Sequence, residues 1–255
     1  MSTVAEIYST IDQLAPFSLS MDFDNTGILV GNRHQDVERA LLALDCTPQV
    51  IAQAIQCRAQ LIITHHPIIF HPLKHVTENE LVYQLVRHNL AVISAHTNLD
   101  IASGGVNDAL AASIGLQNCR GLEPIDPAQN AWLGRIGNLS APMDAVSFAQ
   151  TVKTALTAAS VKFVDGGKPI QTVALCSGAG SDCLETAIAQ GADALLTSEV
   201  KHHEFLLAAQ MGISLFDAGH FDTEDVVIEQ LRSLLSNQIP DVAFFTCHHS
   251  SIQAI

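Results

Sequence analysis

Histidines and carboxylates cluster in three short segments of this sequence. The first is LIITHHP, residues 61–67, where an apolar, β-branched run ends in the adjacent pair His65 and His66. Neutral imidazole is the commonest metal ligand in proteins. Adjacent residues at the end of a strand point to opposite sides of the chain, so these two rings serve two metal ions more easily than they chelate one. If the His65-His66 pair is considered alone, the alternative is that both side chains are solvated in a loop and bind no metal.

The other two segments share a spacing of histidine and carboxylate. His96 is followed four residues later by Asp100, and His220 is followed four residues later by Glu224. Each histidine stands at the end of an expected strand. Imidazole nitrogen together with carboxylate oxygen suits Zn, Mn, Fe, Co or Ni better than Ca or an ion that selects thiolates.

An internal repeat relates these segments. The stretch RALLALDCTPQVIAQAIQCRAQLIITHH, from Arg39, aligns with TVALCSGAGSDCLETAIAQGADALLTSE, from Thr172, as strand, loop, helix and strand. Further on, residues 90–100 match residues 213–224. A duplication puts equivalent ligand-type residues at equivalent strand ends. A pseudo-twofold relation between the halves would bring both sets of strand ends toward one cleft.

The combined set is larger than one catalytic zinc ion needs, which is about three protein ligands plus water. A carboxylate that bridges two ions about 3.5–4 Å apart is the simplest arrangement that uses such a set. The sequence therefore predicts two divalent metal ions per subunit (Zn, Mn, Fe, Co or Ni), with separate surface or core polar groups as the alternative. The candidate residues are His65, His66, His96, Asp100, His220 and Glu224.

Strands alternate with helices along the rest of the chain, which is typical of an α/β architecture with mainly parallel pairing. Strands are expected over residues 28–30, 40–45, 61–64, 91–95, 132–139, 161–164, 172–176, 194–197, 214–217 and 242–246. Helices are expected from Thr3, whose capping-box spacing with Glu6 marks a helix start, and over residues 48–57, 80–88, 106–114, 142–158, 182–190, 204–211 and 223–235.

Two stretches are expected to lack regular structure. Residues 97–105 are expected as a loop, and residues 117–130, with Gly121, Pro124 and Pro127, as a hinge. We therefore expect two similar α/β halves related by a pseudo-twofold duplication, with mixed sheets flanked by helices. The predicted domains are residues 1–120 and 121–255.

Composition limits the function classes. The formal net charge of −14 over 255 residues disfavours nucleic-acid and anionic-membrane partners, and a metal cation is one candidate counter-charge. No apolar run approaches about 18 residues and the N-terminus lacks a basic leader, so we expect a cytoplasmic protein. The six cysteines form no C-x-x-C pair, which favours buried free thiols in a reducing compartment over disulfides or thiolate ligands.

A glycine loop after an expected strand gives a weaker signal. Gly178-Ala-Gly180 resembles half of a dinucleotide-binding fingerprint, but Cys183 stands where the third glycine belongs. We interpret the loop as a tight turn, with a substrate phosphate on the following helix as the alternative. No G-x-S-x-G elbow is present in the sequence, so covalent acyl catalysis has no support.

The segment Asp24-Asn-Thr-Gly-Ile-Leu-Val-Gly31 resembles the W-D-N-x-G-L-x-V-G opening of the Nif-three-like family, with Phe23 in place of the usual Trp. THHP, SAHTNLD, CSGAGS, GADALLTSEVKHHE and AGHFDTE match the remaining family motifs in order over nearly the whole chain. The sequence is thus identified as a member of this family of dinuclear-metal proteins, often named GTP cyclohydrolase I type 2 homologues. It looks like the short form, without an inserted domain, and Thr197-Ser-Glu199 departs slightly from the usual T-G-D/E.

The resemblance implies a Nif-three-like fold and a toroidal homohexamer with metal sites facing its interior. It also implies that Glu224 or Asp100 bridges the two ions and that His96 is a neighbour of the centre or a proton shuttle. The metal ligands that it implies are His65, His66, Asp100, His220 and Glu224.

The leading functional hypothesis is a dinuclear metal-dependent hydrolase in which a metal-activated water attacks the substrate and His96 or Glu199 moves a proton. GTP ring opening comes from the family's name alone, and a phosphoester or an amide is chemically as acceptable. The substrate is expected to be a small molecule or a nucleotide. A non-catalytic metal-binding, regulatory or metal-handling protein is the alternative, because the same ligands serve both.

Overall fold

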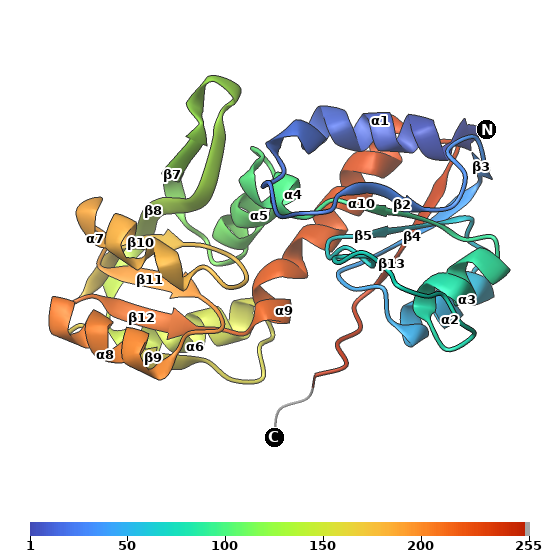
Figure 1. Cartoon of the computed structure of the whole chain (residues 1–255). Helices are drawn as coiled ribbons and strands as arrows, with labels where there is room; N and C mark the ends of the chain where they lie inside the picture. The colour runs from blue at the N-terminus through green and yellow to red at the C-terminus, as the bar shows by residue number, and fades with distance from the viewer. Residues whose placement is uncertain (253–255) are drawn as a thin grey trace. The chain divides into compact units, whose positions relative to one another are not determined.

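A computed structural model describes residues 1–252 of the chain. Its internal contacts divide the chain into two compact units. The first unit consists of Met1–Ala102 together with Ile228–Ser251, and the second contains Ser103–Val227. Figure 1 labels most of the helices and strands of both units, numbered in chain order.

The first unit is built on a five-stranded sheet in the order β13-β4-β5-β6-β2. Strands β13, β4, β5 and β6 run parallel, and β2 pairs antiparallel with β6 at the edge. Strands β5 and β6 are buried along their whole length, which explains their continuous apolar sequences. The bounds are β2 (Gly27–Val30), β4 (Arg39–Ala43), β5 (Leu61–Thr64), β6 (Ala91–Ser94) and β13 (Ala243–Cys247), with a small separate sheet of β1 (Ser2–Thr3) and β3 (Asp36–Val37).

Helices cover both faces of this sheet. Helices α2 and α3 pack on the face formed by Leu41, Ile62 and Val92, and α1 and α10 lie on the other side in Figure 1. Helix α1 starts where the sequence predicts, because Thr3 and Glu6 form the capping box. The bounds are α1 (Val4–Leu14), η1 (Phe17–Leu19), α2 (Pro48–Gln56), α3 (Leu81–Arg87), α4 (Thr97–Ile101) and α10 (Val226–Gln238).

The second unit is built on a six-stranded sheet in the order β7-β8-β10-β11-β12-β9. Strands β10, β11 and β12 run parallel, and β8 and β9 pair antiparallel on either side of them. Their bounds are β7 (Gln117–Asp126), β8 (Ala131–Met143), β9 (Lys162–Val164), β10 (Ile170–Leu175), β11 (Ala194–Thr197) and β12 (Ser214–Asp217).

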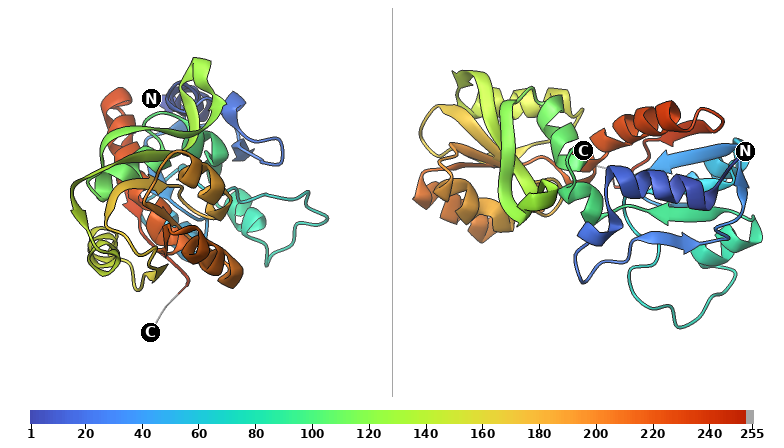
Figure 2. Two further views of the ribbon diagram at one scale, coloured as in Figure 1. Left: turned by 90° about the vertical axis from the view of Figure 1, so that its left-hand side faces the viewer. Right: turned by 90° about the horizontal axis from the view of Figure 1, so that it is seen from above.

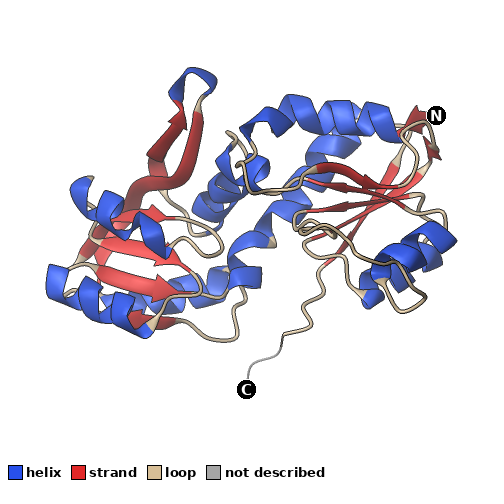
Figure 3. Ribbon diagram, in the orientation of Figure 1, coloured by secondary structure: helices blue, strands red, loops and turns tan. Residues whose placement is uncertain are grey.

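Helices also cover both faces of the second sheet, as the colouring by secondary structure in Figure 3 makes clear. Helices α5 and α6 share a core with Val173, Leu196 and Phe216, whereas α7 and α8 pack against Ala174 and Leu195 on the opposite face. The bounds are α5 (Val106–Ser113), η2 (Pro127–Gln129), α6 (Ala145–Ala155), η3 (Ser181–Cys183), α7 (Leu184–Ala189), α8 (His202–Met211) and α9 (His220–Glu224).

The internal repeat is visible in the order of the strands within each unit. Strands β4, β5 and β6 lie side by side in chain order, as do β10, β11 and β12. In each unit an antiparallel strand then flanks the third, β2 beside β6 and β9 beside β12. The predicted fold class, a duplicated α/β architecture with mixed sheets flanked by helices, is confirmed.

The hinge predicted over residues 117–130 is wrong. This segment forms β7 and the turn of a hairpin with β8, and Figure 2 shows the hairpin from two further sides. Gly and Pro usually mark loops, but an edge strand tolerates Pro124 because the pairing register shifts beside it. Gly121 is required for packing, since a side chain there would overlap the ring of Trp132.

Two helix predictions also need correction. The helix expected from Pro142 begins at Ala145, because Pro142 lies in β8 and the carboxylate of Asp144 caps the helix through the N–H of Ser147, 2.9 Å away. The helix expected over residues 223–235 is α10, which starts three residues later.

The expected loop 97–105 contains α4, and its counterpart α9 is an equally short helix. Five residues are too few to show the helical periodicity of apolar positions on which a prediction depends, and helices this short form through tertiary packing.

The compact units differ from the predicted halves, 1–120 and 121–255. The C-terminal strand β13 pairs with β4, so residues 228–251 lie with the first unit. Helix α5 packs against β8, β10 and α9, so residues 103–120 lie with the second. These pairings join segments that are distant in sequence, and a local pattern carries no signal for them.

Asp193 connects the start of β10 to the turn before β11. Its Oδ2 accepts hydrogen bonds from the backbone N–H groups of Gln171 and Thr172 at 3.0 and 2.9 Å, and Lys168 Nζ lies 3.3 Å from Oδ1. Burial alone raises the pKa of Asp193, but these hydrogen bonds outweigh burial and hold the pKa below its ordinary value.

We expect the free energy of unfolding to fall as the pH drops below about 4, because a carboxyl whose pKa is lowered in the folded state stabilises it only while ionised. Asp193→Asn should cost about 1 kcal/mol at pH 7, and this cost should shrink toward pH 3. Urea unfolding at pH 7, 5 and 3 measures the free energy of unfolding of the wild type and of Asp193→Asn. The variant Asp182→Asn, at an exposed position, is the control. A cost that is the same at all three pH values would contradict the assignment.

Among residues 1–252, no helix is long and apolar enough to cross a membrane.

Candidate metal centre

Three histidines of the first unit meet at the carboxyl ends of two neighbouring parallel strands. His65 and His66 directly follow β5, and His96 stands between β6 and α4. One ring nitrogen from each lies within 4.8 Å of the others. Adjacent parallel strands end at the same edge of a sheet, which is where open α/β sheets place their ligands. The predicted gathering of ligand-type residues at these strand ends is present within this unit.

The rings of His65 and His66 are each held at Nδ1. His65 Nδ1 lies 2.9 Å from the carbonyl oxygen of Ala95, and His66 Nδ1 lies 2.7 Å from Oδ1 of Asp45. A carbonyl or an ionised carboxylate can only accept, so Nδ1 must carry the proton. In the neutral ring, Nε2 then keeps the lone pair that a metal ion needs. A histidine held in this way is typical of metal sites.

His96 is held in the same manner by Asp24. Its Nδ1 lies 2.9 Å from Asp24 Oδ1, and Asp24 Oδ2 accepts from the backbone N–H and the hydroxyl of Thr97 at 3.0 and 2.6 Å. The Asp24 side chain is fully buried, and burial alone would raise its pKa. The hydrogen bonds from His96 and Thr97 outweigh burial and hold the pKa of Asp24 well below its ordinary value. Asp24 is therefore an anion that fixes both His96 and the start of α4.

Asp100 adds a carboxylate oxygen beside the histidines of the first unit. It lies in α4, one helical turn after His96, and its Oδ1 is 3.6 Å from Nε2 of His65. The unprotonated Nε2 of the buried His65 ring thus lies opposite the carboxylate of Asp100. Such an arrangement of nitrogen and oxygen donors suits a divalent cation placed between them.

The second unit holds the other pair of candidate ligands on a single short helix. His220 and Glu224 are the first and last residues of α9, so one turn places both side chains on the same face. His220 Nε2 lies 3.1 Å from Glu224 Oε2, and His220 Nδ1 lies 2.9 Å from Glu199 Oε1. Nδ1 again faces a carboxylate, and Nε2 again lies beside a second acid. Glu224 is buried, and a carboxylate is costly to bury unless donors or a cation balance it.

The glycine loop after β10 leaves the space that Glu224 occupies. A side chain at Gly178 would overlap Glu224 Oε1 and lie 3.2 Å from His220 Nε2, and its φ of +59° also favours glycine. The N–H of Gly178 donates to Thr223 Oγ1 at 3.1 Å, and the N–H of Gly180 donates to Thr197 Oγ1 at 2.9 Å. These amides are therefore already engaged, which favours the tight-turn interpretation over a phosphate site.

Glu199 lies at a backbone position that is unusual for a glutamate. Its φ is +55°, in the left-handed region, and its side chain is 59% exposed beyond the contact with His220. The structure places it against the ring of His220 at Nδ1. The predicted proton-transfer roles of Glu199 and His96 stay predictions.

The sequence patterns did not single out the two acids that hold histidines in the first unit, Asp24 and Asp45. Asp45 did carry a signal, because it ends the predicted strand 40–45, whose carboxyl end lies beside that of β5. Asp24 carried only its place in the family motif at residues 24–31, which gave it no role, since its partner His96 is 72 residues away in sequence.

We expect Glu199→Ala to weaken metal binding at His220 about 10- to 100-fold, because the ring loses the acceptor that fixes its tautomer and orientation. Glu199→Gln is the matched control, since it keeps an acceptor oxygen and the same backbone conformation, and it should bind metal more tightly than the alanine variant. Competition with a chromogenic chelator measures the affinities. Equal affinity in wild type and Glu199→Ala would contradict the positioning role.

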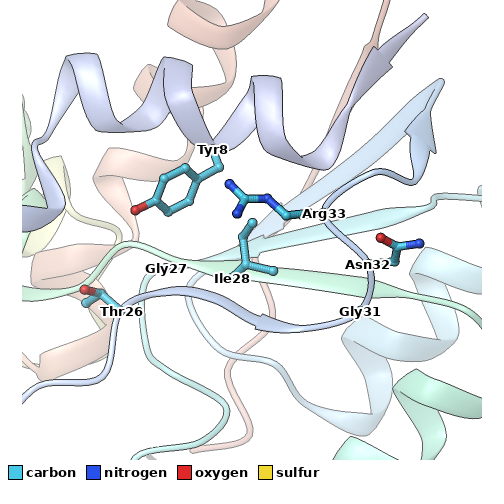
Figure 4. A pocket seen from close by; sticks show the side chains of 7 residues that line it. All are labelled: Tyr8, Thr26, Gly27, Ile28, Gly31, Asn32 and Arg33. Atoms are coloured by element: carbon cyan, nitrogen blue, oxygen red, sulfur yellow. The ribbon is translucent and has the colours of Figure 1, made fainter.

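A separate hollow of about 610 Å³ opens in the first unit beside α1 and β2. In Figure 4 the Tyr8 ring and the Arg33 side chain approach each other above Ile28. The lining residues are Tyr8, Thr26, Gly27, Ile28, Gly31, Asn32 and Arg33. None of these seven is a candidate metal ligand, so this hollow is distinct from the histidine cluster.

Comparison with known proteins decides the family. The model of the Duf34/NIF3 (NGG1p interacting factor 3) family matches residues 2–253. The chain belongs to the Duf34/NIF3 family. The resemblance drawn from the sequence motifs is thereby confirmed.

Relatives within the Duf34/NIF3 family carry a common name. The GTP cyclohydrolase 1 type 2 homolog of Clostridium acetobutylicum is 35% identical over 227 residues, covering 87% of this chain and 85% of that protein. The GTP cyclohydrolase 1 type 2 homolog of Clostridium perfringens is 31% identical over 245 residues, covering 94% of each.

Solved structures share the Duf34/NIF3 fold with this chain. Staphylococcus aureus protein SA1388 matches with a TM-score of 0.94 at 28% identity, over 100% of this chain and 99% of that one. Reduced HcgD from Methanocaldococcus jannaschii matches with a TM-score of 0.81 at 28% identity, over 96% and 97% of the two chains. The Bacillus cereus protein related to NIF3 matches with a TM-score of 0.93 at 23% identity, over 100% and 99%.

Proposed function

We propose that this Duf34/NIF3 protein is a dinuclear metal-dependent hydrolase. The observation that carries the proposal is the common arrangement of His65, His66 and His220: each has Nδ1 held by a carbonyl or carboxylate, which leaves Nε2 to bind metal. The proposed ligands of the two divalent ions are His65, His66, Asp100, His220 and Glu224.

The donor set fits first-row metals. Imidazole nitrogens and carboxylate oxygens suit Zn, Mn, Fe, Co and Ni, and we propose that two such ions are bound per subunit. When bound, these ions would lower the pKa of a coordinated water toward neutrality and polarise the substrate. The chain's formal net charge of −14 favours cation binding as well.

The residues around the ligands orient them and move protons. Asp45 and Glu199 hold the rings of His66 and His220, so that each Nε2 keeps its direction. His96 is suited to carry a proton, because the carboxylate of Asp24 lies 2.9 Å from its Nδ1 and one of its ring nitrogens lies within 4.8 Å of those of His65 and His66. We assign His96 as the proton shuttle, with Glu199 as the alternative.

The relatives' name, GTP cyclohydrolase 1 type 2 homolog, supports a nucleotide substrate and ring opening by water. A phosphoester is the second substrate class that this chemistry serves. We further propose a cytoplasmic homohexamer, as the family resemblance implies, and light scattering in solution tests the assembly.

The function is tested by loading metal-free protein with Mn, Zn or Fe and assaying GTP ring opening together with methyl phosphate hydrolysis. We expect turnover that depends on metal and falls in His96→Ala while the metal stoichiometry stays unchanged. Turnover that is absent with every metal would contradict the hydrolase, and bound metal would then indicate a metal-handling protein. Absence of bound metal in every preparation would contradict the dinuclear centre itself.

A further inference from the structure

We propose that Phe23 and Phe70 form a stacking platform for a planar heteroaromatic ring of the substrate. This inference rests on the proposed function, because it places the platform next to residues of the metal centre in the first unit. It adds two specificity-determining residues that the candidate ligand set does not include.

Both rings are unusually exposed for phenylalanine. The side chains of Phe23 and Phe70 are 64% and 42% exposed, and Leu73 and Val76 of the same loop as Phe70 are also about half exposed. Single exposed apolar residues are normal, but a contiguous patch usually marks a binding surface. The two phenyl rings form such a patch, with centroids 6.5 Å apart.

The two phenyl rings are tilted against each other rather than stacked. The phenyl planes are inclined by 56°, so the two rings do not cover each other's faces. His71 packs edge-on against Phe70 with a centroid distance of 5.0 Å, which restrains the plane of Phe70 and adds a polar edge. An open pair of aromatic faces with a polar neighbour matches a nitrogen-containing planar ring, since such rings stack through their π faces and hydrogen-bond through their edges.

Hydrogen bonds fix the platform to the histidine cluster. Phe23 precedes Asp24, whose carboxylate holds His96 at 2.9 Å. Phe70 follows Ile69, whose carbonyl oxygen accepts from Asn25 Nδ2 at 2.5 Å. The two segments that carry the rings are thus joined to each other, and one of them is joined to His96. This connection favours a substrate over an unrelated protein partner as the occupant.

The test compares alanine and aromatic substitutions in the manganese-loaded protein. Phe23→Ala and Phe70→Ala should weaken binding of GTP, measured by isothermal titration calorimetry, by about 5- to 100-fold. Phe23→Trp, which restores the residue typical of the family motif, and Phe70→Tyr should retain binding. Phe245→Ala is the matched control, since Phe245 is 39% exposed in the same unit but lies on β13.

Binding of inorganic tripolyphosphate separates stacking from metal binding, and it should be equal in wild type and both alanine variants. An equal loss for GTP and tripolyphosphate would overturn the platform. So would an altered oligomeric state in the alanine variants, which would identify the patch as an interface between copies. Failure of guanosine, adenosine and GTP alike to bind the wild type would overturn it too.

The proposed stacking platform and the proposed hydrolase activity can be contradicted by different results. Methyl phosphate carries no aromatic ring, so Phe23→Ala should lower its hydrolysis less than it lowers GTP turnover. Turnover of methyl phosphate without any effect of the phenylalanines on GTP binding would remove the platform alone. Loss of metal and turnover with aromatic-dependent nucleoside binding retained would remove the proposed hydrolase and leave the platform.

Discussion

Glu224→Gln is expected to release at least one of the two proposed metal ions and to abolish the proposed turnover. Glu224 is buried and lies 3.1 Å from His220 Nε2, so its carboxylate supplies both a donor oxygen and a negative charge in a place where water cannot replace them. Glutamine keeps the shape but loses the charge. We expect metal affinity to fall by more than about 100-fold, beyond the loss typical of residues that only orient a ligand.

Elemental analysis of the purified variant by mass spectrometry measures the metal content. Glu185→Gln is the matched control, because Glu185 is an exposed residue of α7 in the same unit. Circular dichroism checks that both variants are folded. Unchanged metal stoichiometry in Glu224→Gln would contradict the role of Glu224 as a ligand.

Gly178→Ala is expected to displace Glu224 without changing any ligand. The new Cβ would overlap Glu224 Oε1 and crowd His220 Nε2, so the carboxylate must move or the loop must shift. The loop is held by hydrogen bonds to the Gly178 carbonyl oxygen from the N–H and the hydroxyl of Ser198, at 3.0 and 2.6 Å. We therefore expect the side chain of Glu224 to give way and metal affinity to fall at least about 10-fold.

A matched variant at a second glycine separates the effect of backbone strain from the effect of displacing Glu224. Gly191→Ala also places alanine at a positive φ, +79°, but its Cβ meets nothing within 4 Å. Both variants should lose about 1–2 kcal/mol of stability from the left-handed conformation. Only Gly178→Ala should lose metal affinity, as measured by chelator competition. Similar metal affinities in the two variants would show that Glu224 does not depend on the space beside Gly178.

Much of the architecture could be predicted because short apolar strands carry a strong local signal. The run from Leu61 to Thr64 predicts a buried strand from composition alone, and the repeat predicts a second copy of the pattern. The capping box at Thr3 likewise depends on residues only three positions apart. Local and repeated signals of this kind can be recognised in the sequence without knowledge of the fold.

Elements stabilised by distant partners could not be predicted in the same way. Strand β7 contains Gly121 and Pro124 and resembles a loop locally, but β8 supplies its hydrogen bonds. Helices α4 and α9 are single turns whose stability comes from packing rather than from an amphipathic pattern. The register of β13 on β4 joins residues about 200 positions apart.

The sequence by itself determined the chemistry of the candidate centre: histidines and carboxylates at strand ends, repeated in two copies, in a chain with excess negative charge. Only the tertiary structure decided which nitrogen each histidine presents. Asp24 and Asp45 reach their rings across 72 and 21 residues of chain, and Gly178 leaves the space for a carboxylate 46 positions later. Residue type and spacing encode what a side chain can bind, whereas its tautomer, direction and room depend on contacts that form only when distant segments pack together.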